Sequence, residues 1–212
     1  AMMLNGCPVC FDAEAHTYTL GGRELSGITG LLREKLFPAT YDGVDAQVLA
    51  NAAAYGSAVH RMCERYDTLG EYPDNEDLHA YVGLKVEEHL THQASEYLVS
   101  DLEHYASCID KVYRVDDGTC DIADIKTTSK VHIPNVTLQT SIYAWLFERQ
   151  NEGAQVRNLY CIWLPKPQYG EADIIQLQRV PSSICEQVCE LYEQGANPIQ
   201  ARGLLTACGF DF

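Results

Sequence analysis

The sequence predicts a single α/β domain, a sheet with helices around it. Strand-like segments alternate with helical ones along the chain, and no repeat, low-complexity tract or linker separates them. A chain of 212 residues, 46% of them hydrophobic, can bury a core without help from disulfides or metals. We divide it into an N-terminal hairpin and short helix (1–43), a core (44–180) and C-terminal helices (181–212).

The N-terminal half begins with a hairpin at 16–25, because a Gly-Gly turn separates two strand-like segments. Either Ser26 or Thr29 is expected to cap the short helix that follows, since both side chains can accept a hydrogen bond from a free helical N–H. Apolar spacing then predicts helices at about 44–69 and 77–88.

The C-terminal half alternates strands and helices. Turn residues bound each β-rich segment, and Pro134 opens a helix. Strands are expected at about 103–115, 120–128, 156–164 and 173–180, a helix at about 134–150, and two short helices after Pro181.

The charge of the chain restricts what it can bind. The formal net charge is −15, which argues against a broad surface for nucleic acid, so any contact with phosphates must be local. No apolar segment is long enough for a membrane helix, and the first residues do not resemble an export signal. We therefore expect a cytoplasmic protein without a membrane partner.

The nine cysteines are scattered through apolar segments, which is typical of reduced, buried thiols. Cys7 and Cys10 have the spacing of half a zinc or iron–sulfur site, but no second pair follows. A small Cys-ligated metal protein is one alternative, which elemental analysis would reveal.

The chemistry is concentrated in the hairpin formed by the strands 103–115 and 120–128. A loop at 116–118 places Asp110 directly opposite Asp124, and directly opposed side chains share one face. Lys126 lies two residues beyond Asp124 and faces the same way. The hairpin thus gathers two carboxylates and an ammonium.

The neighbours on that face are mostly apolar: Cys108, Val112, Cys120 and Ile122. Two carboxylates in a partly dry site raise one pKa or recruit a cation, and hard oxygen ligands suit Mg²⁺ or Mn²⁺. Such an ion can polarise a phosphoryl oxygen and activate water. The alternative is a solvent-facing hairpin with ordinary charges.

Four short motifs follow one another along the chain: Gly56-Ser-Ala-Val-His60, Cys108-Ile-Asp110, Asp124-Ile-Lys126-Thr127 and Gln139-Thr-Ser-Ile-Tyr143. Their order resembles the PD-(D/E)xK nuclease superfamily, in particular its RecB-type and phage-type exonuclease branch. The resemblance covers about residues 11–150. The chain differs from the family at Ser107, where the family has Gly, and at Asp124, where that branch commonly has Glu.

The resemblance implies a restriction-endonuclease-like core, a central mixed sheet flanked by helices. It implies that Mg²⁺ or Mn²⁺ binds to His60, Asp110, Asp124 and the backbone carbonyl of Ile125, with Lys126 as the catalytic lysine. The remaining candidates would support the site or contact DNA: Gln139, Tyr143, Thr127, Thr128 and Glu64. No iron–sulfur cluster is expected, because Cys185, Cys189 and Cys208 do not match the family's cysteine run.

The implied function is a metal-dependent deoxyribonuclease in phage, prophage or host recombination and repair, with an exonuclease favoured over an endonuclease. The implied partners are linear DNA ends and a single-strand annealing protein, and a homo-oligomer is compatible with the sequence. The other alternative is an inactive nuclease-fold module, which the negative charge favours. Strand polarity, strand preference, oligomeric state and the physiological metal are left open.

Overall fold

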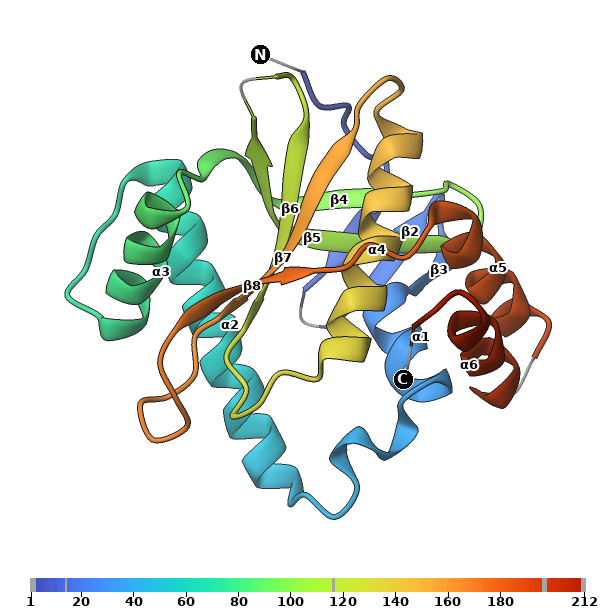
Figure 1. The fold of residues 1–212 in the computed structure, drawn as a ribbon, viewed down its shortest axis with the longest axis horizontal. Helices are drawn as coiled ribbons and strands as arrows, with labels where there is room; N and C mark the ends of the chain where they lie inside the picture. The colour runs from blue at the N-terminus through green and yellow to red at the C-terminus, as the bar shows by residue number, and fades with distance from the viewer. Residues whose placement is uncertain (1–2, 14, 116, 196–197, 211–212) are drawn as a thin grey trace.

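The computed structural model describes residues 3–210 apart from 14, 116, 196 and 197, and shows a mixed sheet between two layers of helices (Figure 1). The described strands are β1 (Cys10–Asp12), β2 (Thr17–Leu20), β3 (Arg23–Gly27), β4 (Thr91–Ser100), β5 (Tyr105–Arg114), β6 (Cys120–Lys126), β7 (Val156–Trp163) and β8 (Asp173–Leu177). The described helices are α1 (Ile28–Lys35), the 3₁₀ turn η1 (Pro38–Tyr41), α2 (Ala46–Leu69), α3 (Glu76–Glu87), α4 (Ile133–Gln150), α5 (Ser182–Glu193) and α6 (Pro198–Ala207).

The sheet branches at β5. Its order is β1-β2-β3-β5-β6-β7-β8, and β4 pairs along the other edge of β5. The pairs β3–β5 and β6–β7 are parallel, and the others are antiparallel. This confirms the predicted class, a central mixed sheet flanked by helices with an N-terminal hairpin and C-terminal helices.

The two faces of the sheet bury different helices. Helix α4 lies across one face together with α1, α5 and α6, and their side chains form the larger core (Figure 1). Helices α2 and α3 cover the other face and form a second core with β5, β6 and β7. Within the described residues, no helix is both long and apolar enough to cross a membrane.

The helix ends follow local sequence signals, with one exception. The side chain of Asp45 caps α2, which ends at Gly70 with a φ of 70°, and the side chain of Asn75 caps α3. The predicted cap of α1 by Ser26 or Thr29 is wrong, because α1 begins after Gly27 without a side-chain cap. Ser26 instead extends β3 into its parallel pairing with β5.

The hairpin β5–β6 has the predicted register, since Lys111 pairs with Ala123 and Arg114 with Cys120. Asp116 of its turn lies outside the described residues. The described pairing ends one step before Asp110 and Asp124, which the sequence placed directly opposite each other. The two strands separate there, and the Asp110 side chain of β5 accepts the hydrogen bond of the Ile125 backbone N–H of β6.

Strands β1 and β4 were not predicted. The segment Thr91–Ser100 is mostly polar and only partly buried, so it lacks the alternation that marks a half-buried strand. Its pairing with β5 over almost its whole length holds it in the sheet. Long-range backbone pairing here determines a structure that the local sequence does not indicate.

Candidate metal and active site

His60 lies on the face of α2 that packs on the sheet. Its Nε2 is 3.0 Å from the carbonyl oxygen of Ile125, and its Nδ1 is 3.5 Å from Asp110 Oδ1. Burial lowers the pKa of this imidazole, but the carboxylates of Asp110, Asp124 and Glu96, Asp110 foremost, together outweigh burial and the pKa rises to about 9. The structure therefore brings together three of the four expected metal-binding groups.

Asp110 is buried where β5 and β6 separate. Its Oδ2 accepts a hydrogen bond of 2.7 Å from the backbone N–H of Ile125, in place of a partner from the sheet. Burial raises the pKa of this carboxyl, yet the neighbouring His60 and Lys126 bring it below its usual value. Asp110 is thus kept ionised, and its hydrogen bond to the backbone of β6 fixes the orientation of its carboxylate.

Glu96 joins this group from β4, and sequence reasoning missed it. It lies between the pairs Ser95–Lys111 and Tyr97–Ile109, level with Asp110. One potential ligand atom from each of His60, Glu96 and Asp110 lies within 4.8 Å of the other two. Burial, together with the charge of Asp110, raises the pKa of Glu96 to about 7.

Asp124 is held by groups from two elements. Its Oδ1 accepts a 2.7 Å hydrogen bond from Gln139 Nε2, and Lys126 Nζ is 2.8 Å from its Oδ2. Lys126 Nζ also donates to Gln139 Oε1 at 3.3 Å. The carboxylate, the ammonium and the amide therefore form a closed arrangement beside Asp110.

Gln139 and Tyr143 project together from α4, as one helical turn requires. Gln139 Nε2 lies 2.6 Å from the Tyr143 hydroxyl, and both side chains are buried. Through Gln139 the pair contacts Asp124, and both roles expected for these residues, support of the site and contact with DNA, stay predictions. Thr29, expected to cap α1, instead has its Oγ1 3.3 Å from the Tyr143 hydroxyl.

The other three candidates lie around the site rather than in it. Thr127 is half-buried, and its Oγ1 would lie 3.2 Å from a Cβ built on Gly56 of α2. Thr128 is exposed and donates to the carbonyl of Lys130. Within the described chain, the ring of His60 contacts Asp110 and the Ile125 carbonyl, and no contact pairs it with Glu64.

The donor set fits a hard divalent cation. His60, Glu96, Asp110 and the Ile125 carbonyl offer one nitrogen and several oxygens, the ligands expected for Mg²⁺ or Mn²⁺. Asp124 Oδ2 is buried, and apart from its ion pair with Lys126 at 2.8 Å it has no hydrogen-bond partner among the described residues. Burial raises the pKa of Asp124 in spite of the neighbouring Lys126. A bound cation would add a second positive charge beside this buried carboxylate.

No cysteine among the described residues is a candidate metal ligand, although the Cys108 thiol donates a 3.3 Å hydrogen bond to Glu96 Oε2. Cys7 is half-buried and Cys10 exposed, and among the described residues no cysteine belongs to a group of three potential metal ligands. Burial raises the pKa values of several thiols, for example Cys63 and Cys161 to about 12. Such thiols are protonated and unreactive at neutral pH.

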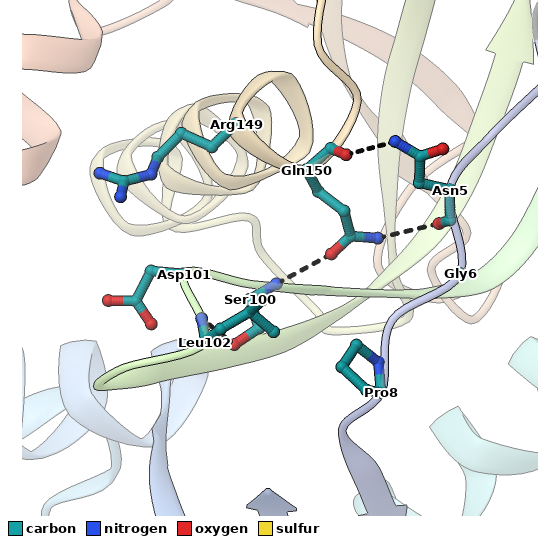
Figure 2. A pocket seen from close by; sticks show the side chains of 8 residues that line it. All are labelled: Asn5, Gly6, Pro8, Ser100, Asp101, Leu102, Arg149 and Gln150. Atoms are coloured by element: carbon teal, nitrogen blue, oxygen red, sulfur yellow. Dashed lines mark hydrogen bonds between the residues drawn. The ribbon is translucent and has the colours of Figure 1, made fainter.

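A shallow pocket lies elsewhere, where the N-terminal segment packs on the end of α4 (Figure 2). The amide of Gln150 donates to the Asn5 carbonyl and accepts from the Ser100 N–H. These bonds give the pocket a structural role in anchoring residues 5–8. Its lining residues are Asn5, Gly6, Pro8, Ser100, Asp101, Leu102, Arg149 and Gln150.

Several solved structures resemble this chain in shape, and the two that follow are among them. No family model and no curated protein matches the chain. The crystal structure of SSO0001 aligns with a TM-score of 0.48 and 12% identity, over 83% of this chain and 78% of the other. An alkaline exonuclease (LHK-Exo) from Laribacter hongkongensis aligns with a TM-score of 0.39 and 12% identity, over 80% and 84%. At this level of similarity, neither structure identifies the function of this chain.

Proposed function

We propose that this chain is a metal-dependent deoxyribonuclease that hydrolyses phosphodiester bonds with Mg²⁺ or Mn²⁺ and acts from DNA ends. The supporting observation is the convergence of His60, Glu96, Asp110 and the Ile125 carbonyl next to Lys126. A cation bound by these groups would polarise a phosphoryl oxygen and lower the pKa of bound water.

Lys126 supplies the fixed positive charge of the proposed reaction. Burial lowers the pKa of its ammonium, but Asp124 and Asp110 more than compensate and keep it protonated. Asp124 and Gln139 fix the position of Nζ, so little reorganisation is needed when negative charge develops on the phosphate. The ammonium also orients the attacking water.

The decisive experiment is the digestion of end-labelled linear DNA beside closed circular DNA, with Mg²⁺, with Mn²⁺ and with EDTA. We expect linear DNA to be degraded only when the metal is present, and Asp124→Ala or Lys126→Ala to lower kcat by more than about a hundredfold. Asp117→Ala is the matched control, because Asp117 lies in the exposed turn at the other end of the same hairpin.

Activity that survives both site variants would refute this assignment. Cutting of the circular substrate would show an endonuclease instead. If the wild-type chain neither cleaves DNA nor binds Mn²⁺ in a calorimetric titration, it is an inactive member of the fold. A role in phage recombination, a cytoplasmic location and a single-strand annealing partner stay predictions from the resemblance.

A further inference from the structure

Beyond the site itself, three segments meet next to Lys126. The β6–α4 loop packs against α2, since a Cβ on Gly56 would meet Thr127. The indole N–H of Trp163 at the end of β7 donates to the Thr128 carbonyl at 2.8 Å. Gly170 of the β7–β8 loop packs on the Trp163 ring, where a Cβ would lie only 2.9 Å from it. These contacts link α2, the β6–α4 loop and the β7–β8 loop beside the paired ends of β6 and β7.

Basic side chains lie on these segments. Lys130 of the β6–α4 loop is exposed, and Lys166 of the β7–β8 loop is exposed with its ammonium 4.7 Å from the centre of the Tyr55 ring on α2. Among the described residues, neither lysine forms an ion pair with a carboxylate. We name Thr127, Thr128, Lys130 and Lys166 the rim surface.

Eight of the other 13 lysines and arginines form ion pairs among the described residues. Arg65 pairs with Glu71, Arg157 with Asp121, and Arg179 with Glu148. The two buried lysines of α3 and β5 share one aspartate.

The segments of the rim surface are also poor in acids. The sequence has 30 acidic residues, but none from Ile125 to Phe147 and none from Gly153 to Gly170, and the β7–β8 loop carries one, the exposed Glu171. The neighbouring Asp77 accepts hydrogen bonds from the Tyr55 hydroxyl through both oxygens. A strongly acidic protein thus keeps one acid-poor, lysine-bearing surface, and it adjoins the candidate site.

We infer that the rim surface binds the sugar-phosphate backbone of the DNA strand being cut, with Lys130 and Lys166 contacting phosphates next to the scissile one. The inference rests on the proposed function and adds the path of the substrate to it. Hydroxyls of Thr127 and Thr128 offer further polar contacts of the kind that position a backbone without reading sequence. Phosphate contacts by lysine make binding depend on salt.

The test uses the full chain and its variants Lys130→Ala, Lys166→Ala and the double variant. Arg114→Ala is the matched control, because it removes one exposed positive charge at the far end of β5. KM and kcat are measured on linear DNA over a series of NaCl concentrations, and the dissociation constant for labelled DNA is measured in an Asp124→Asn background.

We expect each lysine variant to raise KM and the dissociation constant with kcat little changed. Each lost contact should reduce the slope of log affinity against log salt by about 1. Arg114→Ala should leave the slope unchanged.

If the wild type cleaves DNA and the lysine variants keep its KM and its salt slope, the inference about the rim surface is wrong. The proposed nuclease activity is unaffected by that result. An equal effect of Arg114→Ala also overturns the inference, because bulk charge would then account for binding. A wild-type chain that neither binds nor cleaves DNA overturns the inference together with the proposed function.

Discussion

Glu96 has both an unusual backbone conformation and a raised side-chain pKa. Its φ of 47° lies in the left-handed region, which costs an ordinary L-residue about 1–2 kcal/mol. Such strain persists where surrounding structure imposes it, commonly at functional sites. Here the pairing of β4 with β5 imposes it and turns the carboxyl toward His60 and Asp110. Glu96 is thus a candidate ligand that lies outside the DxK pattern.

The variant Glu96→Gln should bind Mn²⁺ about 10- to 100-fold more weakly, a loss typical of altered metal surroundings. Calorimetric titration measures it, with Glu87→Gln at the exposed end of α3 as the matched control. An affinity equal to that of the wild type would remove Glu96 from the site.

The same variant should be more stable without metal above neutral pH. The folded-state pKa of Glu96 is about 7, above its ordinary value of 4.5, so ionisation costs stability as pH rises between these values. Glutamine cannot ionise and avoids this cost. Thermal unfolding in EDTA at pH 8 should give a higher Tm for Glu96→Gln, and a lower Tm would contradict the raised pKa.

At the scale of elements, a buried ion cluster joins α2, α3 and β5 behind the site. Asp67 on α2 pairs with Lys85 of α3 and, at 2.7 Å, with Lys111 of β5. The hydroxyl of Tyr81 donates to the same carboxylate at 2.6 Å. Lys111 follows Asp110 in β5, and Asp67 lies two turns beyond His60 on α2. The cluster therefore sets how the helix carrying His60 sits on the strand carrying Asp110.

The variant Asp67→Asn should lose about 3–5 kcal/mol of stability at neutral pH, because it leaves buried ammonium groups uncompensated. Denaturant unfolding measures the loss. The matched control is Glu71→Gln, which breaks an exposed pair with Arg65 and should change stability little. Comparable losses of stability in Asp67→Asn and Glu71→Gln would contradict the argument that the buried ion pairs contribute more than the exposed one.

The difference in stability between the wild type and Asp67→Asn should depend on pH, because it reflects the ionisation of Asp67. Burial raises the pKa of its carboxyl, but Lys111, Lys85 and Tyr81 together bring it below the ordinary 3.8. Its contribution is therefore complete above about pH 4 and is lost as pH falls through the lowered folded-state pKa. The stability difference between wild type and Asp67→Asn should shrink below pH 4, and a constant difference down to pH 2 would refute this.

At the scale of the whole molecule, the charge of −15 is distributed unevenly. Much of the basic charge is used in local ion pairs, so the remaining surface is strongly acidic and repels itself. The rim surface is the acid-poor exception. Salt weakens the long-range repulsion and so stabilises the fold, whereas it also weakens phosphate contacts and so lowers the affinity for DNA. Measuring stability and DNA affinity over the same salt series therefore distinguishes the two effects.

Moderate salt should stabilise the metal-free protein while weakening its binding to DNA. Screening within a Debye length relieves self-repulsion, and about 1 kcal/mol of relief corresponds to roughly 2–4 °C in Tm for a chain of this size. Thermal scans in EDTA with NaCl and with KCl at equal ionic strength measure the effect and control for specific ions. A Tm that falls with both salts would show that attractive ion pairs dominate.

The sequence by itself determined the hairpin and what it carries. A short turn and two-residue alternation are local properties, so the register that brings Asp110 near Asp124 and Lys126 could be read directly, and one helical turn sufficed to join Gln139 to Tyr143. Only the tertiary structure decided that β4 delivers Glu96 and that β5 and β6 separate at Asp110. Those features depend on pairing and burial between segments far apart in the chain. The placement of Lys166 beside Tyr55 has the same origin, because loop positions follow from the packing of the elements they connect.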